Sequence, residues 1–120
     1  MKQEAEQWIE KANEDIKVLS ILIHREDAEE MTSTIGFHCQ QAIEKLLKSF
    51  LIYHKTDFRK THDLNELRDK CGDLDPDFKD IEFAVDYRYP DDSYIPDTEE
   101  VKSNQDLVLR IKKIVENKIN

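Results

Sequence analysis

Four hydrogen-bonding residues recur at helical spacing in the middle of the chain: His38, Gln41, Lys45 and Lys48. Steps of three and four residues place such side chains on one face of a helix. Histidine can donate, accept or titrate near neutral pH, glutamine can donate and accept, and lysine carries a positive charge. The stripe predicts either a face that contacts a ligand or partner, or an ordinary solvated face with His38 hydrogen-bonded at its edge.

A second group, Thr61-His62-Asp63-Leu64, stands where a further helix is expected to begin. Asp63 can accept hydrogen bonds from the free N–H groups of the first turn, and a neutral His62 can bond to the backbone. On spacing alone, the group indicates a capping device. The same His62 is also a candidate ligand-binding residue.

A third group, Tyr87-Arg88-Tyr89-Pro90, lies where Pro90 must end a helix. An arginine between aromatic rings can be held by stacking and can present a planar fork to phosphate or carboxylate. The alternative is that Arg88 bonds to the last carbonyls of the helix or pairs with nearby acidic residues. The two interpretations are evenly balanced.

Other chemistries have little support in the sequence. The only glycines are Gly36 and Gly72, so there is no glycine-rich phosphate loop. His38, Cys39 and Glu44 lack a recognisable metal-ligand spacing, and we expect neither a metal nor another cofactor. Cys39 lies on an apolar stripe and is predicted to be a buried thiol.

The overall composition indicates one helical domain over residues 1–120. Glycine and proline are scarce, with two and three residues, and no alternation typical of strands is present. No export signal or membrane-spanning run appears, and two cysteines do not form a secreted disulfide framework. These features predict a cytoplasmic protein that does not enter a membrane.

The formal net charge is −9, but it is unevenly distributed. Residues 45–62 hold five lysines and arginines against Asp57 alone, whereas residues 73–100 hold eleven acidic residues against Lys79 and Arg88. An acidic chain is a poor non-specific binder of nucleic acid. A local cationic end can still meet phosphate or an acidic protein surface, or it can be a solvated charge run.

Apolar periodicity predicts the helices that must position these groups. Long helices are expected over residues 3–24 and 31–54, the second with two apolar stripes. One stripe includes Cys39 and Phe50, and the other is Phe37, Leu47 and Leu51. A helix that is apolar on two sides is central or covered by a partner chain. Three more helices are expected: from the cap Asp63 to Gly72, from 76 to about 87, and from about 98 to the end.

Taken together, the three groups resemble those of the HEPN domain family (higher eukaryotes and prokaryotes nucleotide-binding). The matching residues are the run HCQQAIEKLLK from His38 to Lys48, then Thr61 to Leu64, then Arg88-Tyr89-Pro90. The resemblance covers nearly the whole chain. It implies an all-α, up-and-down four-helix bundle with an extra short helix, five helices in all, paired as a homodimer.

The resemblance also implies function. Small prokaryotic members often pair with a minimal nucleotidyltransferase in toxin–antitoxin-like systems, and many are metal-independent RNA endonucleases. Those enzymes carry an Arg followed, after four to six residues, by a His. Here the positions after Arg88 are Ser93, Tyr94 and Ile95, and no other arginine has a His at that spacing. The ribonuclease motif therefore lacks its His, and arginine alone is a poor proton carrier.

The leading hypothesis is therefore a homodimeric module that binds nucleotide or RNA phosphate, or a nucleotidyltransferase partner, without cutting RNA. An active ribonuclease with a non-standard catalytic set and a purely structural interaction subunit are the alternatives. No catalytic residue is assigned. In the leading hypothesis Arg88 holds phosphate, and the other candidate ligand-binding residues are Tyr87, Tyr89, Lys45, Lys48, His38, Gln41 and His62.

Overall fold

The computed structural model describes residues 2–58, 60–83 and 95–119. These residues form four α-helices and no strand: α1 (Lys2–Ile23), α2 (Thr32–Tyr53), α3 (Leu64–Leu74) and α4 (Thr98–Ile119). Two short 3-10 helices, η1 (Ala28–Glu30) and η2 (Pro76–Phe78), lie between them. The all-α class is confirmed, and α1 and α2 match the two long helices predicted from periodicity to within about a residue at each end.

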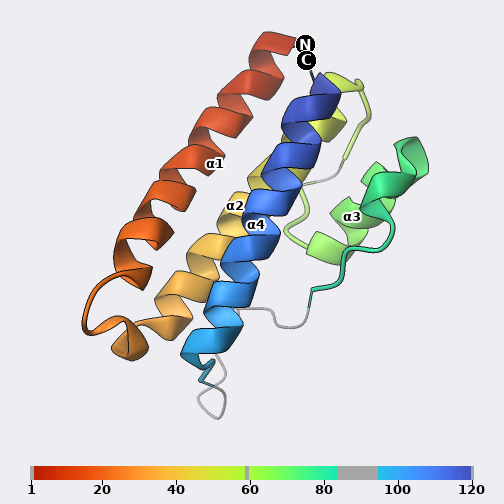
Figure 1. Ribbon diagram of the computed structural model, residues 1–120. Helices are drawn as coiled ribbons and strands as arrows, with labels where there is room; N and C mark the ends of the chain where they lie inside the picture. Colours follow the sequence, from red (N-terminus) through yellow and green to blue (C-terminus); the bar gives the residue numbers. More distant parts are fainter. Residues whose placement is uncertain (1, 59, 84–94, 120) are drawn as a thin grey trace.

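The helix α2 is central, because it packs against α1, α3 and α4. Figure 1 shows α1 running antiparallel to α2, while α2 and α4 rise in the same direction. The segment between α2 and α4 therefore carries the chain back along the length of the bundle, with α3 packed beside α2. This arrangement differs from a simple up-and-down succession of neighbouring antiparallel helices.

The apolar stripes of the three long helices meet in one core. Residues such as Leu19, Leu46 and Ile111 are fully buried there. Phe50 stacks at a tilt on Phe78 of η2, with ring centroids 4.5 Å apart, and thereby fastens the return segment to α2. Burying such aromatic rings contributes most of the packing energy at this end of the bundle.

The second apolar stripe of α2 is covered by the chain itself. Leu47 and Leu51 are fully buried, and the Cys71 thiol of α3 donates a 3.6 Å hydrogen bond to the Leu47 carbonyl. Phe37, in contrast, remains 38% exposed. Burial of the stripe by α3 explains its apolar character without a partner chain, so this stripe no longer argues for a dimer.

The predicted end of the third helix is wrong. Gly72 was expected to end the third helix, but α3 continues through it to Leu74, and the glycine does not have a positive φ angle. Its role is close packing, since a Cβ atom at this position would lie 3.0 Å from Cγ of Lys79. The left-handed residue that follows a helix end is instead Lys55, with a φ of 56° just after α2.

The helix predicted from 76 to about 87 is not helical in its described part beyond η2. The Asp75 cap and Pro76 do start a turn, and Asp75 accepts a hydrogen bond from the backbone N–H of Asp77. The chain then leaves the helical path. The Ile81 carbonyl accepts a 2.8 Å hydrogen bond from the Arg68 guanidinium. Tyr87, where this helix was expected to end, lies outside the described residues.

Candidate functional site

The polar stripe on α2 is not a solvated face, because buried acids divide it between two clusters. The first, the Asp15 cluster, joins α1 to α2. Lys45 donates a 2.6 Å hydrogen bond from Nζ to the Asp15 carboxylate, and Nδ1 of His38 lies 3.0 Å from its other oxygen. The Asp15 residue is only 8% exposed, whereas the His38 and Lys45 side chains are about one quarter exposed.

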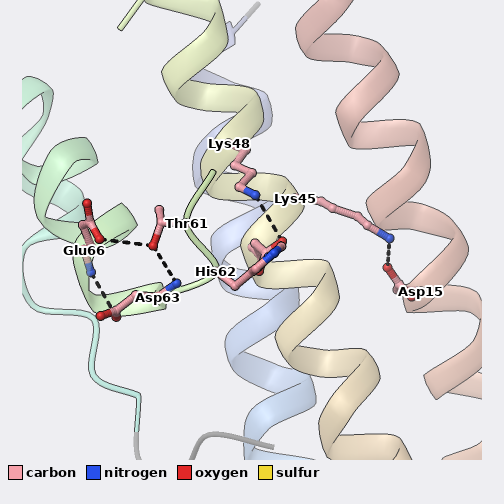
Figure 2. A network of polar contacts seen from close by, with 8 residues as sticks. Asp15, Lys45, Lys48, Thr61, His62, Asp63 and Glu66 are labelled. Atoms are coloured by element: carbon pink, nitrogen blue, oxygen red, sulfur yellow. Dashed lines mark hydrogen bonds and ion pairs between the residues drawn. The ribbon is translucent and has the colours of Figure 1, made fainter. Parts of the chain in front are cut away.

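The second, the Glu44 cluster, joins α2 to the segment that precedes α3. Glu44 accepts a 3.2 Å hydrogen bond from Nζ of Lys48, and Nδ1 of His62 lies 3.0 and 3.1 Å from the two carboxylate oxygens. Glu44 and Lys48 are both buried, while the His62 side chain is 63% exposed. Figure 2 shows Lys45 and Lys48 on the same stretch of α2, with Lys45 reaching toward Asp15 of α1 and His62 coming from the other side.

The start of α3 holds His62 in place. Asp63 is the predicted N-cap: its carboxylate accepts from the backbone N–H groups of Asn65 at 2.9 Å and Glu66 at 3.3 Å. Thr61 accepts from the Asp63 N–H and donates to Glu66. The capping device is confirmed, and the His62 side chain bonds to Glu44.

Two aromatic rings enclose Lys48. Its Nζ atom lies 5.7 Å from the ring centroids of both Trp8 on α1 and Phe58 in the α2–α3 connection. A lysine ammonium group over aromatic faces gains cation–π attraction. Lys48 is therefore a fixed counter-ion of Glu44, and its ammonium group is not free to reach an external phosphate.

Pairing with the acids also neutralises the two lysines of the polar stripe. With neutral histidine rings, each cluster contains one carboxylate and one ammonium group and has no net charge. A buried carboxylate at Nδ1 fixes the orientation of an imidazole ring and directs its other nitrogen, Nε2, away from the acid. The groups best placed to meet a ligand are the exposed edges of His62 and, less so, His38.

The remaining candidates are distributed unevenly. Gln41 is half-buried on α2 and lies between His38 and Lys45 in the sequence. Tyr87, Arg88 and Tyr89 lie outside the described residues, so their relation to the two clusters stays a prediction.

Four residues that contact the lysines or histidines of the two clusters were not among the candidates from the sequence: Trp8, Asp15, Glu44 and Phe58. Asp15 had a readable signal, because it occupies the buried register of α1 between Ala12 and Leu19. Glu44 likewise stands one heptad before Leu51, on the second apolar stripe. An acid at a core position of an amphipathic helix indicates a buried partner of opposite charge.

The two cysteines take no part in either cluster. Cys39 and Cys71 are free and buried, and burial raises the pKa of each thiol to about 12. The expectation of a buried Cys39 thiol is confirmed. In the described ranges, no three or more His, Cys, Asp or Glu side chains gather in a way that could hold a metal ion.

The fold and the site define an all-α domain whose central helix carries two acid–base clusters beside a capped helix start. The family model of the HEPN domain matches residues 5–118, and the chain belongs to that family. No curated protein and no solved structure matches it. Membership supports a nucleotide- or RNA-related module, and HEPN domains commonly dimerise. Across the described helices, none combines the length and apolar composition that a membrane span requires.

Proposed function

We propose that this HEPN domain is a cytoplasmic, homodimeric module that binds the phosphate of a nucleotide or RNA without cutting it. We further propose that it pairs with a nucleotidyltransferase in a toxin–antitoxin-like system. Family membership and the absence of a His after Arg88 at the ribonuclease spacing support this choice.

The observation that carries the proposal is a pair of buried acids, Asp15 on α1 and Glu44 on α2, whose partners lie along one stretch of α2. Taking a carboxylate and an ammonium group out of water costs several kcal/mol per ion, and apolar residues of similar size would often stabilise a core better. Asp15 and Glu44 nevertheless occupy such positions, and each engages a histidine at Nδ1. An arrangement that is costly for stability and orders two partly exposed rings supports a role in binding a ligand.

Within this site the residues have different roles. Arg88 is proposed to supply the lasting positive charge, with Tyr87 and Tyr89 as its stacking partners; all three lie outside the described residues. His62 offers its exposed ring edge as a hydrogen-bond donor to a phosphate oxygen. Lys45, about one quarter exposed, can assist beside His38, whereas Lys48 acts through Glu44.

Titration of the purified protein with nucleotides and short RNAs at low salt tests the proposal. We expect saturable binding that weakens with salt, and loss of most of it in Arg88→Ala. Arg110→Ala is the matched control, because it removes an exposed arginine from α4. Absence of binding by the wild type, or equal binding by Arg88→Ala and Arg110→Ala, would contradict the ligand part of the proposal.

A second candidate function, metal-independent RNA cleavage, is favoured by one specific observation. A carboxylate at Nδ1 of His38 and of His62 is the arrangement that prepares an imidazole to carry protons. RNA cleavage in the presence of a chelator, abolished by His62→Gln or His38→Gln, would establish this function. Intact RNA after prolonged incubation with the wild type would exclude it.

The partner proposals need separate measurements. Sedimentation at micromolar concentration tests the homodimer, and Phe37→Ser, which alters the exposed member of the second apolar stripe, tests whether that face contributes. Co-expression with a nucleotidyltransferase encoded nearby tests the complex. A stable complex formed by a protein that binds no nucleotide or RNA would favour the purely structural alternative.

A further inference from the structure

The Glu44 carboxylate is shared by two groups that can each carry a positive charge. Lys48 approaches from within α2 and His62 from the segment before α3. One carboxylate can neutralise only one of them. The protonation state of His62 therefore decides whether the Glu44 cluster is neutral or carries one net positive charge.

The structure also determines where that additional charge would lie. The Lys48 side chain is 7% exposed and lies against the Trp8 and Phe58 rings, so it cannot turn outward. The His62 side chain is 63% exposed, and both carboxylate oxygens of Glu44 lie near the same ring nitrogen. Protonation would therefore place an N–H donor and a net positive charge together on the exposed edge of His62.

We propose that His62 forms a subsite for a phosphodiester oxygen that binds when the ring is protonated, and that the buried Glu44–Lys48 pair holds the ring in position. The inference rests on the proposed function, since it adds regulation by pH to the same phosphate site. A bound anion favours the protonated ring, so a proton is taken up on binding. By linkage, affinity rises as pH falls through the range in which histidine titrates.

The other charged groups around His62 have defined partners. From α3, Glu66 accepts from Thr61, and Asp63 accepts from the first backbone N–H groups of the helix. From α2, Glu44 is bonded to His62, and Lys48 is bonded to Glu44. Lys60, two residues before His62, is exposed. His38 is less exposed than His62 and belongs to the Asp15 cluster.

The test uses an oligouridylate without terminal phosphates, because neither its phosphodiesters nor its bases titrate between about pH 5 and 8. Affinity is measured at two pH values and constant ionic strength. We expect roughly three- to tenfold tighter binding at about pH 5.5 than at about pH 7.5, since one linked proton changes affinity by at most about tenfold per pH unit. His62→Gln should remove this dependence, while His24→Gln, a matched exposed histidine at the end of α1, should retain it.

Calorimetry of the wild type in two buffers of different ionisation enthalpy gives a second readout, in which proton uptake on binding should appear and should vanish in His62→Gln. Wild-type binding that is equal at both pH values, or a dependence that survives His62→Gln, would overturn the His62 subsite and leave the proposed function standing. Absence of oligonucleotide binding at both pH values would overturn the His62 subsite together with binding of RNA phosphate.

Discussion

Replacing Asp15 by alanine should destabilise the domain far more than the same substitution at an exposed position of α1. The Asp15 carboxylate is buried and is the common acceptor of two groups on α2, Nζ of Lys45 at 2.6 Å and Nδ1 of His38 at 3.0 Å. Its loss leaves a lysine beside the core without its counter-ion. It also removes the polar tie between α1 and α2.

The expected magnitude follows from these contacts. A hydrogen bond to a charged group contributes about 1.5–3 kcal/mol, and breaking a buried ion pair costs about 3–5 kcal/mol. Because the Lys45 and His38 side chains are about one quarter exposed, water recovers part of that loss. We expect a decrease of about 2–3 kcal/mol in the free energy of unfolding, or roughly 8–15 °C in Tm for a domain of this size.

Chemical denaturation of Asp15→Ala, Lys45→Met and the double variant measures this energy directly. The double variant should cost about 1–2 kcal/mol less than the sum of the single variants, because it leaves no buried charge unpaired. Glu14→Ala is the control, since it removes an exposed acid one residue earlier on the same helix. If Asp15→Ala and Glu14→Ala were equally stable, the role assigned to the buried acid would be refuted.

Three further predictions concern the support around the site. Asp63→Ala should lower stability by about 1 kcal/mol in denaturant unfolding through loss of the α3 cap, whereas Asp73→Ala at the other end of α3 should not. Hydrogen bonds from the backbone N–H of Asp77 and then from Lys118 lower the pKa of the Asp75 carboxyl below its ordinary 3.8, so ionised Asp75 stabilises the fold above that value and loses this contribution as the pH falls through its folded pKa. The free energy of unfolding, measured between about pH 5 and 2, should therefore fall less steeply in Asp75→Asn than in the wild type. Equal slopes would contradict this prediction. Cys39 and Cys71, with pKa values raised to about 12 by burial, should resist a thiol reagent until the protein unfolds, and rapid labelling of the native state would count against the packing described.

Local signals were sufficient to predict the long helices. Apolar residues at steps of three and four gave α1 and α2 nearly to the residue, and Asp63 with Glu66 marked the start of α3. These features depend on neighbours within one or two turns. The exposure of a single residue, such as His62, depends instead on segments brought together only by the fold.

The errors have the same physical origin. Gly72 looks like a helix end by local preference, but α3 continues because the glycine admits Lys79 at close range. The segment after Pro76 has helical periodicity, yet the Arg68 hydrogen bond to the Ile81 carbonyl and the packing of Phe78 on Phe50 hold it in another path. Tertiary contacts outweighed propensities of a few tenths of a kcal/mol per residue.

The candidate site was half visible in the sequence. His38, Lys45 and Lys48 were identified as a polar stripe that either contacts a ligand or partner or is solvated, and His62 as part of a capping device and a candidate ligand-binding residue. Asp15 and Glu44, which neutralise the lysines and orient the histidines, stand on apolar stripes. An acid at a core position of a helix indicates a buried partner of opposite charge, and this signal identifies both residues.

The central claim is that the protein binds RNA phosphate and leaves the RNA whole. The most direct measurement follows the anisotropy of an end-labelled RNA during titration at about pH 6, where histidine is partly protonated, and then resolves the same samples on a denaturing gel. We predict saturable binding, lost in Arg88→Ala, with RNA of unchanged length. Shortened RNA in the presence of a chelator, or no change in anisotropy up to high protein concentration, would contradict the account.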